Sequence, residues 1–336
     1  RWVTEGLGMT TDKELENAKS NAQGTSRTHD VWLILHNGPY VQEDVRRNAT
    51  AGSRNPLVMA EPSWLCSTGA NGNQPMRHKD TAGFPAEEAL ISDYWDRLIL
   101  PLRAFPMTGY IAWGCYPDRS YVEVKGKLMS SHHALSNLRE YGVRREPWRL
   151  YARSGERRYY DWGHRFSRFT GDWCVVNWES PGKPKGAFIT ASGGSGRSGK
   201  LPLFWGEKAN PMMINSGVIG HWLLDYYLTG DERSLDIMYR IKESFAANKW
   251  DVRGNILGLK PLISLSMLDW DENALRAARE TAHTYIDLES QNGIKGGGYG
   301  PMYKDHRTGY TLAEYYLETG DETIKEAILK LHDQRY

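Results

Sequence analysis

Long apolar runs are missing from this sequence, because no stretch approaches the roughly 20 residues that a helix needs to span a bilayer. An excess of one charge is missing too: 42 basic residues face 41 acidic ones, which leaves a net charge of +1. Such a balance gives no electrostatic attraction for nucleic acid or for an anionic membrane. We therefore expect no nucleic-acid partner and no membrane insertion.

Cysteine is scarce, and the chain lacks the common metal-binding motifs. Cys66, Cys115 and Cys174 are far apart and odd in number, which favours neither a disulfide framework nor a metal site. No HExxH sequence, calcium loop or Cys/His cluster is present, so we predict no metal. The stretch from Gly194 to Lys200 resembles a phosphate-binding loop, but Leu201 follows where that motif places Ser or Thr. A flexible glycine loop is the better interpretation.

Phenylalanine is rare, and the other aromatic residues are abundant. The chain has 7 Phe against 13 Trp and 19 Tyr. Trp and Tyr combine an apolar ring with a polar group, a combination that suits sugar faces and wet clefts as well as ordinary packing. This composition favours a carbohydrate-binding cleft.

One sequence pattern occurs three times: an aromatic helix end, a Ser/Thr-Gly-acid turn, and a second helix. The turns are Ser154-Gly155-Glu156, Thr229-Gly230-Asp231 and Thr319-Gly320-Asp321. Each glycine can adopt the left-handed conformation that ends a helix, and each acid can cap the next one. Helical hairpins of this kind cannot bury their apolar faces alone, so they stack or close into a ring.

The predicted fold is mainly α with a β-rich N-terminal part. We expect a β-rich domain or remnant over 1–125 and a toroid of helical hairpins over 126–336, interrupted by a long loop at 174–211. About four hairpins are countable, so the toroid is predicted to be a truncated (α/α)6 barrel. The expected helices are 130–141, 146–153, 156–172, 212–229, 231–247, 255–268, 271–290, 308–318 and 321–333.

Within the N-terminal part, the apolar run from Val31 to Leu35 is typical of a buried strand. Residues 110–114 and 121–124 are also predicted to be extended. A helix is expected from Glu87 to about Leu102, and the segment from His36 to Pro85 is expected to be mostly loop.

The predicted helix 156–172 has two contrasting faces. Trp162, Phe166, Phe169 and Trp173 form its apolar stripe, whereas Tyr160, His164 and Arg168 lie one turn apart on the opposite face. Asp161 with Arg165, and Arg168 with Asp172, have the spacing of ion pairs. The polar face is either a solvated outer surface or part of a cleft. In a cleft, His164 would transfer a proton and Arg168 would hold a carboxylate.

The predicted helix 212–229 is apolar almost all round, which indicates an inner wall of the ring. His221 and Asp225, four residues apart, form its narrow polar strip. A carboxylate one turn away can fix the tautomer of a histidine and raise its basicity. The pair is therefore either a satisfied core interaction or catalytic, and His221 is our first candidate.

Several segments resemble a known family. They are Thr25–Leu33, Tyr94–Pro101, Trp113–Gly114 and Pro147–Trp162. Together with the hairpin pattern they resemble the six-hairpin glycosidases and polysaccharide lyases, and most closely the exo-rhamnogalacturonan lyases, which carry a β domain before an (α/α) toroid. The resemblance implies β-elimination on pectic, rhamnogalacturonan-like glycans and a secreted or periplasmic location. Residues 175–178 read VVNW where such relatives carry histidines, so no catalytic residue is transferred.

A uronate lyase needs a cation to neutralise the substrate carboxylate, a base and an acid, and it needs no cofactor. The candidates are Arg168 or Arg165 as the cation, with His221, His164 and Tyr160 as proton-transfer groups. Candidate substrate-binding residues are also Trp162, Trp173, Trp178, Trp222 and Asp225. One alternative is a glycoside hydrolase with two carboxylates about 5–10 Å apart, chosen from Asp172, Glu179 and Asp225. A non-catalytic glycan-binding protein is the second alternative. Because the sequence starts at Arg1 without a signal-peptide pattern, we expect a piece of a longer protein.

Overall fold

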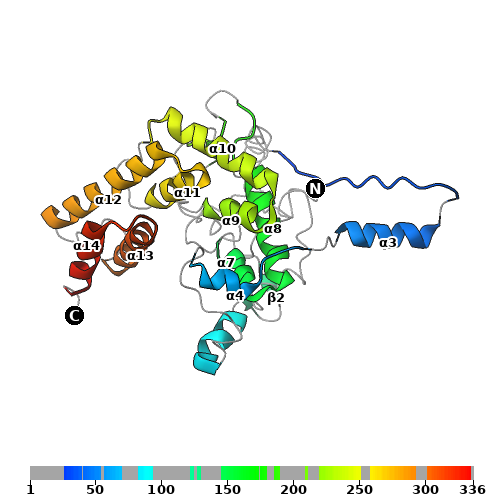
Figure 1. The fold of residues 1–336 in the computed structure, drawn as a ribbon, viewed down its shortest axis with the longest axis horizontal. Coiled ribbons are helices and arrows are strands. Elements are labelled where there is room, and N and C mark those ends of the chain that lie inside the picture. Colours follow the sequence, from blue (N-terminus) through cyan, green and yellow to red (C-terminus); the bar gives the residue numbers. More distant parts are fainter. Residues whose placement is uncertain are drawn as a thin grey trace.

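The structure is a computed structural model, and it shows a mainly helical protein (Figure 1). It describes residues 26–39, 41–53, 57–69, 82–93, 122–124, 127–129, 145–173, 175–179, 185–189, 209–210, 219–250, 258–292 and 301–333.

Four helical hairpins follow one another along an arc (Figure 1). They are α7 (Glu146–Ser154) with α8 (Arg157–Trp173), α9 (Gly220–Thr229) with α10 (Glu232–Ala247), α11 (Leu259–Asp269) with α12 (Glu272–Asn292), and α13 (Pro301–Thr319) with α14 (Glu322–Asp333). The first helix of each hairpin lies on the inner side of the arc, where α9 contacts α7 and α11, and α11 contacts α13. The second helices form the outer layer. The hairpins are as predicted, and a closed toroid stays a prediction.

The three predicted turns adopt the predicted conformation. Gly155, Gly230 and Gly320 have φ angles of 68°, 73° and 66°, and the side chain of Asp231 caps α10 through the amide of Ser234. A fourth turn, between α11 and α12, has the same geometry without glycine. Here Trp270 takes the left-handed position with φ 57°, and Asp271 follows as the capping acid.

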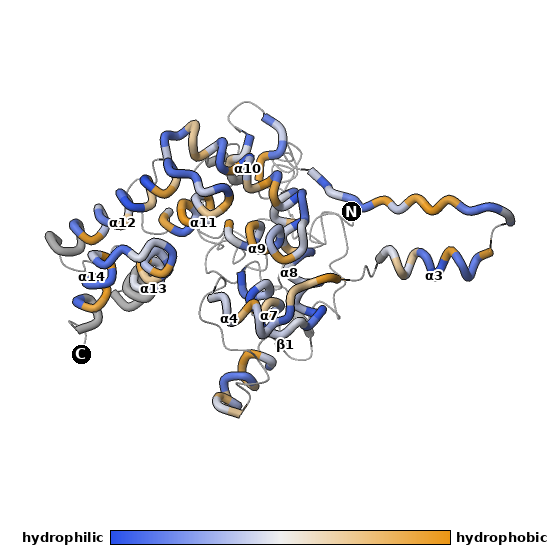
Figure 2. The backbone as a smooth tube through the Cα atoms, viewed as in Figure 1, coloured by the Kyte–Doolittle hydropathy of each residue, from blue (hydrophilic) through white to orange (hydrophobic). Residues whose placement is uncertain are grey.

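The hydrophobic core lies between the inner and outer helices. α9 and α11 are apolar around most of their circumference, so they are buried on nearly all sides (Figure 2). The outer helices α8 and α10 are amphipathic and turn their polar faces away from the core. The largest fully buried side chains include Trp148, Trp222, Tyr151, Tyr315, Phe166 and Phe169.

Three outer helices, α8, α10 and α12, are each linked to the next hairpin by a basic side chain that contacts the next turn acid. Arg168 of α8 lies 2.7 Å from Asp231, and Lys242 of α10 lies 2.7 Å from Asp271. His283 of α12 lies 3.0 Å from Asp321. The three basic residues occupy equivalent places, 11 or 12 residues after the turn acid of their own hairpin. The same residue position therefore links each hairpin to its successor.

The N-terminal part differs from two predictions. Val31 to Leu35 is extended but pairs with no strand among the described residues, and Leu33 is 87% exposed. The predicted buried strand is therefore wrong. The segment predicted as loop contains the helices α3 (Gln42–Ser53) and α4 (Pro62–Ser67), because polar but helix-compatible stretches lie between its glycines and prolines.

The rest of the N-terminal prediction is tested only in part. Residues 85–93 are helical and overlap the first part of the helix expected at 87–102. The strand β1 (Val122–Val124) pairs antiparallel with β2 (Lys127–Met129), as expected for 121–124. The expected strand 110–114, the helix 130–141 and residues 212–218 lie outside the described residues. The β-rich character of 1–125 and the domain boundary stay predictions.

The described parts of the long loop 174–211 are docked on the outer layer. Val176 exchanges backbone hydrogen bonds with residues 186 and 187, and β3 (Phe188–Ile189) pairs with β4 (Ala209–Asn210). Gly186 has φ 80°, and a Cβ built on it would lie 1.9 Å from the carbonyl oxygen of Arg240. Only glycine permits this close approach to α10. These residues of the loop therefore lie against the outer helix α10.

Candidate functional site

The polar face of α8 contacts the next hairpin through His164 and Arg168. His164 Nδ1 lies 3.3 Å from Oδ1 of Asp225, whose carboxylate has no exposed surface. The ring of Tyr160 stacks on His164 with centroids 5.3 Å apart. Two of the predicted catalytic residues and one predicted binding residue thus lie together.

Arg168 extends this group towards the N-terminal segment. Its guanidinium lies 2.7 Å from Asp231 and 3.1 Å from Asp30. Asp172, the predicted partner of Arg168, contacts other residues instead. It accepts hydrogen bonds from Ser26, Thr28 and Arg233.

The electrostatics of this group are perturbed by burial and by carboxylates. Burial alone would lower the pKa of His164, but the hydrogen bond with Asp225 and the charges of Asp225 and Asp231 raise it. Burial also raises the pKa of Asp225. Burial, together with nearby carboxylates, raises the pKa of Tyr160 to about 12. A tyrosine with so high a pKa is a poor base near neutral pH.

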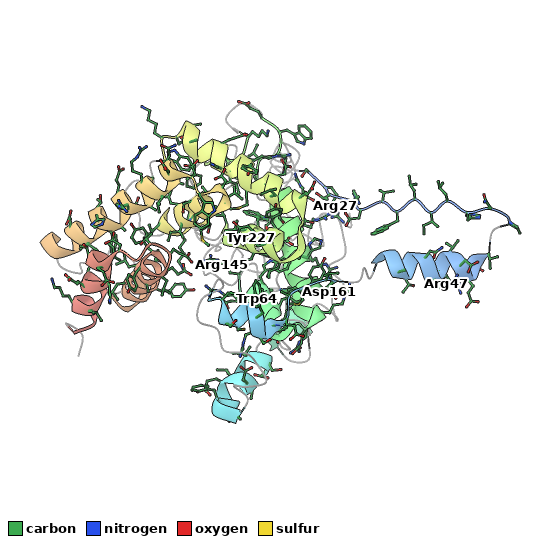
Figure 3. All side chains as sticks on the ribbon, in the orientation of Figure 1. Arg27, Arg47, Trp64, Arg145, Asp161 and Tyr227 are labelled. Carbon is green, nitrogen blue, oxygen red and sulfur yellow. The ribbon has the colours of Figure 1, made fainter. Side chains whose placement is uncertain are left out.

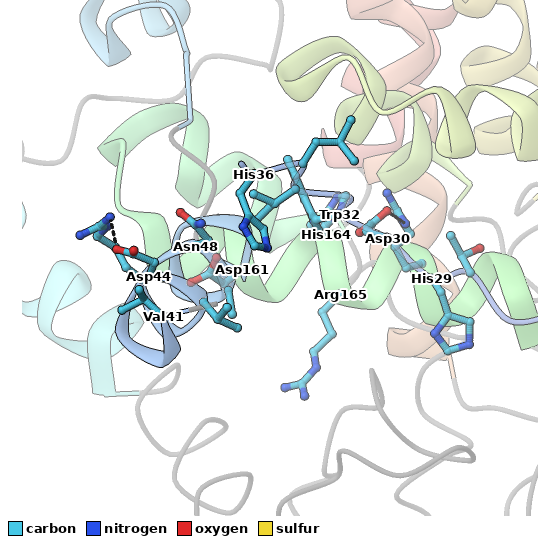
Figure 4. A pocket seen from close by; sticks show the side chains of 18 of the residues that line it. His29, Asp30, Trp32, His36, Val41, Asp44, Asn48, Asp161, His164 and Arg165 are labelled. Carbon is cyan, nitrogen blue, oxygen red and sulfur yellow. Dashed lines mark hydrogen bonds and ion pairs between the residues drawn. The ribbon is translucent and has the colours of Figure 1, made fainter. Parts of the chain in front are cut away.

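Tyr160, His164 and Arg168 line a cavity, which we call the outer cavity, between α8 and residues 28–52 (Figure 4). Its α8 wall contains Arg157, Tyr160, Asp161, His164, Arg165 and Arg168. Its other wall includes Trp32 and α3. The structure therefore brings the predicted Tyr160, His164, Arg165 and Arg168 together, on the outer layer of the arc.

Other predicted site residues lie elsewhere. His221 and Trp222 have no exposed surface, and Trp162 is 6% exposed. The Nε2 atom of His221 lies 3.0 Å from Thr170 Oγ1, inside the core. In this structure none of the three can contact a sugar, so we assign them to packing and do not retain His221 as a catalytic residue.

The two remaining predicted tryptophans follow α8 or end it. Trp178 is 69% exposed on the segment after α8, and the side chain of Trp173 lies outside the described residues. Of the carboxylates considered for hydrolysis, Asp172 and Asp225 are fully buried, whereas Glu179 is exposed. The described residues therefore do not provide an accessible pair among these three.

A second polar group, not predicted from the sequence, lies on the inner side of the arc. We call it the inner cluster; it consists of Arg145, Arg149, Lys260, Tyr310 and Glu314. Glu314 lies 3.1 Å from Arg145, 3.4 Å from Arg149 and 3.4 Å from Lys260. Arg149 donates to the hydroxyl of Tyr310 at 2.9 Å, and the Lys260 ammonium lies 3.9 Å from the centre of the Tyr310 ring. Figure 3 shows Arg145 between α7 and α13.

The N-terminal ends of three inner helices meet at the inner cluster. Arg145 and Arg149 belong to the start of α7, and Lys260 belongs to the first turn of α11. Arg145 also lies against Gly220 at the start of α9, where a Cβ would be 2.5 Å from its Nε atom. Because helix N-termini carry partial positive charge, the three ends add to the field of the side-chain cations. The place favours an anion.

The side chains of the inner cluster are partly accessible. Arg145 and Arg149 are each 18% exposed, and Lys260 and Glu314 are each 14% exposed. Tyr310 is 48% exposed. A ligand can reach these groups without unfolding the helices, unlike the buried His221.

Burial shifts the protonation equilibria of the cluster. It lowers the pKa of Lys260 to about 8, helped by the charges of Arg145 and Arg149 and opposed by Glu314. Burial would raise the pKa of Glu314, but the surrounding cations hold it below its usual value. Burial raises the pKa of Tyr310, with Glu314 adding to the shift. Lys260 is therefore the group in the cluster best suited to exchange a proton near neutral pH.

Sequence reasoning missed this cluster because Arg145 and Glu314 are 169 residues apart. One local signal was available: Lys260 is the only charged residue in the first two turns of the otherwise apolar α11. A cation on a buried inner helix requires a partner or a function.

Comparison of the chain with protein-family models, with curated proteins and with solved structures found no match. Within the described residues, no helix is both long and apolar enough to cross a membrane. The same part of the chain holds no group of three His, Cys, Asp or Glu side chains that could bind a metal ion. The function of the chain is therefore inferred from the geometry of the outer cavity and of the inner cluster.

Proposed function

We propose that this chain is part of a carbohydrate-active enzyme, a polysaccharide lyase that cleaves uronate-containing, pectic glycans by β-elimination at the inner cluster of an (α/α) toroid. The observation that carries the proposal is Lys260, whose pKa is lowered to about 8 beside two arginines at converging helix N-termini. This arrangement provides a base and an anion-binding site in one place.

The cluster offers a group for each requirement of β-elimination. Arg145 and Arg149 bind the uronate carboxylate, and their charge makes the neighbouring C–H bond more acidic. Neutral Lys260 takes that proton, and the released electron pair forms the ring double bond as the glycosidic C–O bond breaks. The Tyr310 hydroxyl, with its raised pKa, remains protonated and donates a proton to the departing oxygen. Glu314 holds the cations in place.

Hydrolysis fits the cluster less well. A hydrolase needs one protonated carboxylic acid and a second carboxylate. Glu314 is surrounded by three cations that hold its pKa low, so it remains ionised and cannot act as the acid. A glycan-binding protein without activity remains the alternative class, and the experiment below distinguishes it.

To test this proposal, the protein is incubated with pectic polysaccharides, and the formation of unsaturated product is measured by ultraviolet absorbance. Lys260→Arg retains the positive charge and removes the base, so we expect activity to fall by roughly 100-fold or more. Lys242→Arg is the matched control, because Lys242 lies on the outer helix α10 and only links two hairpins. Binding without unsaturated product, or full activity in Lys260→Arg, would contradict the proposal.

A further inference from the structure

One cation that lines the outer cavity, Arg165, forms no direct hydrogen bond or ion pair with a described residue. Most of its charged residues are paired: Arg157 with Asp161 at 3.2 Å, Arg47 with Asp44 at 2.6 Å, and Arg168 with Asp30 at 3.1 Å. No hydrogen bond or ion pair joins Arg165 to any described residue, and Figure 4 shows its side chain extending away from the others.

Leaving a half-buried guanidinium unpaired is unfavourable. Burial lowers the pKa of Arg165, and the charge of Asp161 offsets only part of this effect. The neighbouring Arg168 also has a buried Nε atom that lacks a partner. A partly buried guanidinium without a direct partner is stabilised when an anion with several acceptor oxygens enters the site.

The same cavity presents aromatic rings. Trp32 is 57% exposed, and its ring is supported by α3 through close contact at Gly52. On the opposite wall Tyr160 stacks on His164. Rings with an apolar face and a polar edge suit a sugar, and a guanidinium suits the carboxylate of a sugar acid.

We propose that the outer cavity is a second glycan-binding site, separate from the inner cluster, in which Arg165 binds the carboxylate of a uronate residue and Trp32 and Tyr160 contact its ring. The choice of a glycan as ligand rests on the proposed function, but the anion site itself rests on the unpaired Arg165. We assign glycan binding to this site and assign cleavage to the inner cluster alone.

The experiment measures the binding of a uronate oligosaccharide by calorimetry in the Lys260→Arg background, so that the ligand is not consumed. We expect two binding sites. Arg165→Gln weakens binding at one of them by roughly 10- to 100-fold, because a charge-assisted contact is lost. Arg276→Gln is the control, because Arg276 lies exposed on the outer helix α12 and bonds only Asn273 among the described residues.

The outcomes separate this inference from the proposed function. Arg165-dependent binding, together with no unsaturated product from the protein that retains Lys260, would support the second site and contradict the lyase activity. Unchanged affinity and stoichiometry in a folded Arg165→Gln protein would overturn the second site. The assignment of this site to a uronate would be overturned if the methyl-esterified oligosaccharide bound with the same affinity as the free acid. It would also be overturned if inorganic phosphate displaced the oligosaccharide as effectively as a uronate does.

Discussion

Gly220 begins α9 at a point where any side chain would collide with Arg145 of the inner cluster. A Cβ there would lie 2.5 Å from the Nε atom and 2.8 Å from the Cζ atom of that arginine. These atoms form the far end of a flexible side chain, so the arginine can move aside. The glycine thus determines where the guanidinium lies.

We expect Gly220→Ala to lower kcat/KM by about 10-fold while leaving the fold intact, because it displaces Arg145 from Glu314. The gain in helix propensity, about 1 kcal/mol, offsets most of the cost of crowding. Steady-state kinetics and thermal unfolding measure the two effects. Gly309→Ala in α13 is the control, since a Cβ there meets nothing within 4 Å. Equal kinetics in both variants would contradict this role of Gly220.

Lys260 predicts a pH dependence of stability with a definite sign. Its pKa falls from 10.5 to about 8 on folding, so between these values the unfolded chain holds the extra proton. Stability therefore rises as pH increases through this window. We expect Lys260→Met to lose this rise, measured as the difference in urea unfolding between pH 8 and pH 10. Parallel pH profiles for the two proteins would show that the pKa of Lys260 is not lowered in the folded state.

Residue spacing predicted local neighbours well and tertiary partners poorly. The one-turn spacing placed Tyr160, His164 and Arg168 on one face of α8, and the structure confirms it. The same spacing suggested Asp225 as a catalytic partner for His221, but α9 is buried on nearly all sides and Asp225 contacts His164 of the neighbouring helix. Spacing along one helix does not tell which neighbour each face meets.

At the scale of the elements, the turns explain why the sequence motif was recognised in three hairpins and not in the hairpin of α11 and α12. Glycine marks the left-handed position in three turns, whereas Trp270 occupies it between α11 and α12. The capping acid is present in this turn as well, as Asp271. All four turns share the left-handed conformation, but only three of them carry the glycine that marks it in the sequence.

We expect Trp270→Gly to stabilise the protein by about 1 kcal/mol, because a left-handed conformation costs a non-glycine residue roughly that much. Trp270 is 85% exposed, so little packing is lost. Gly230→Ala is the reciprocal change and should destabilise by about 1 kcal/mol, since a Cβ there meets no neighbour and only the φ angle of 73° is unfavourable. Chemical unfolding measures both. Shifts of the same sign in the two variants would contradict the argument.

At the scale of the whole molecule, hydrophobic periodicity predicted the arc of hairpins, because most of its helices are long and their turns carry local signals. It failed in the N-terminal part. The run from Val31 to Leu35 has the composition of a buried strand, yet its position is fixed by polar contacts of the residues before it. Those contacts reach α8, some 140 residues further along the chain, and no local pattern reveals them.

The anchor of this segment is Asp172, near the end of α8. Its carboxylate accepts hydrogen bonds from the Ser26 hydroxyl at 2.9 Å and from the Thr28 hydroxyl at 2.8 Å, and it also pairs with Arg233 at 3.0 Å. One buried carboxylate therefore serves both the N-terminal segment and the junction between α8 and α10. The two roles can be separated by mutation.

The double change Ser26→Ala and Thr28→Val removes the two hydroxyl contacts to Asp172 and leaves the backbone amide contacts of these residues and the pair between Asp172 and Arg233. We expect faster limited proteolysis within residues 26–53 and loss of uronate binding in the outer cavity, because one wall is released, with an unchanged unfolding midpoint of the hairpins. Asp172→Ala should instead lower stability by about 2 kcal/mol, since it also removes the buried one of the two carboxylates that pair with Arg233. If the double variant kept its protease resistance while Asp172→Ala lost stability, the two hydroxyls would not hold the segment, which would then depend on the backbone amide contacts to Asp172 and on the pair between Arg168 and Asp30.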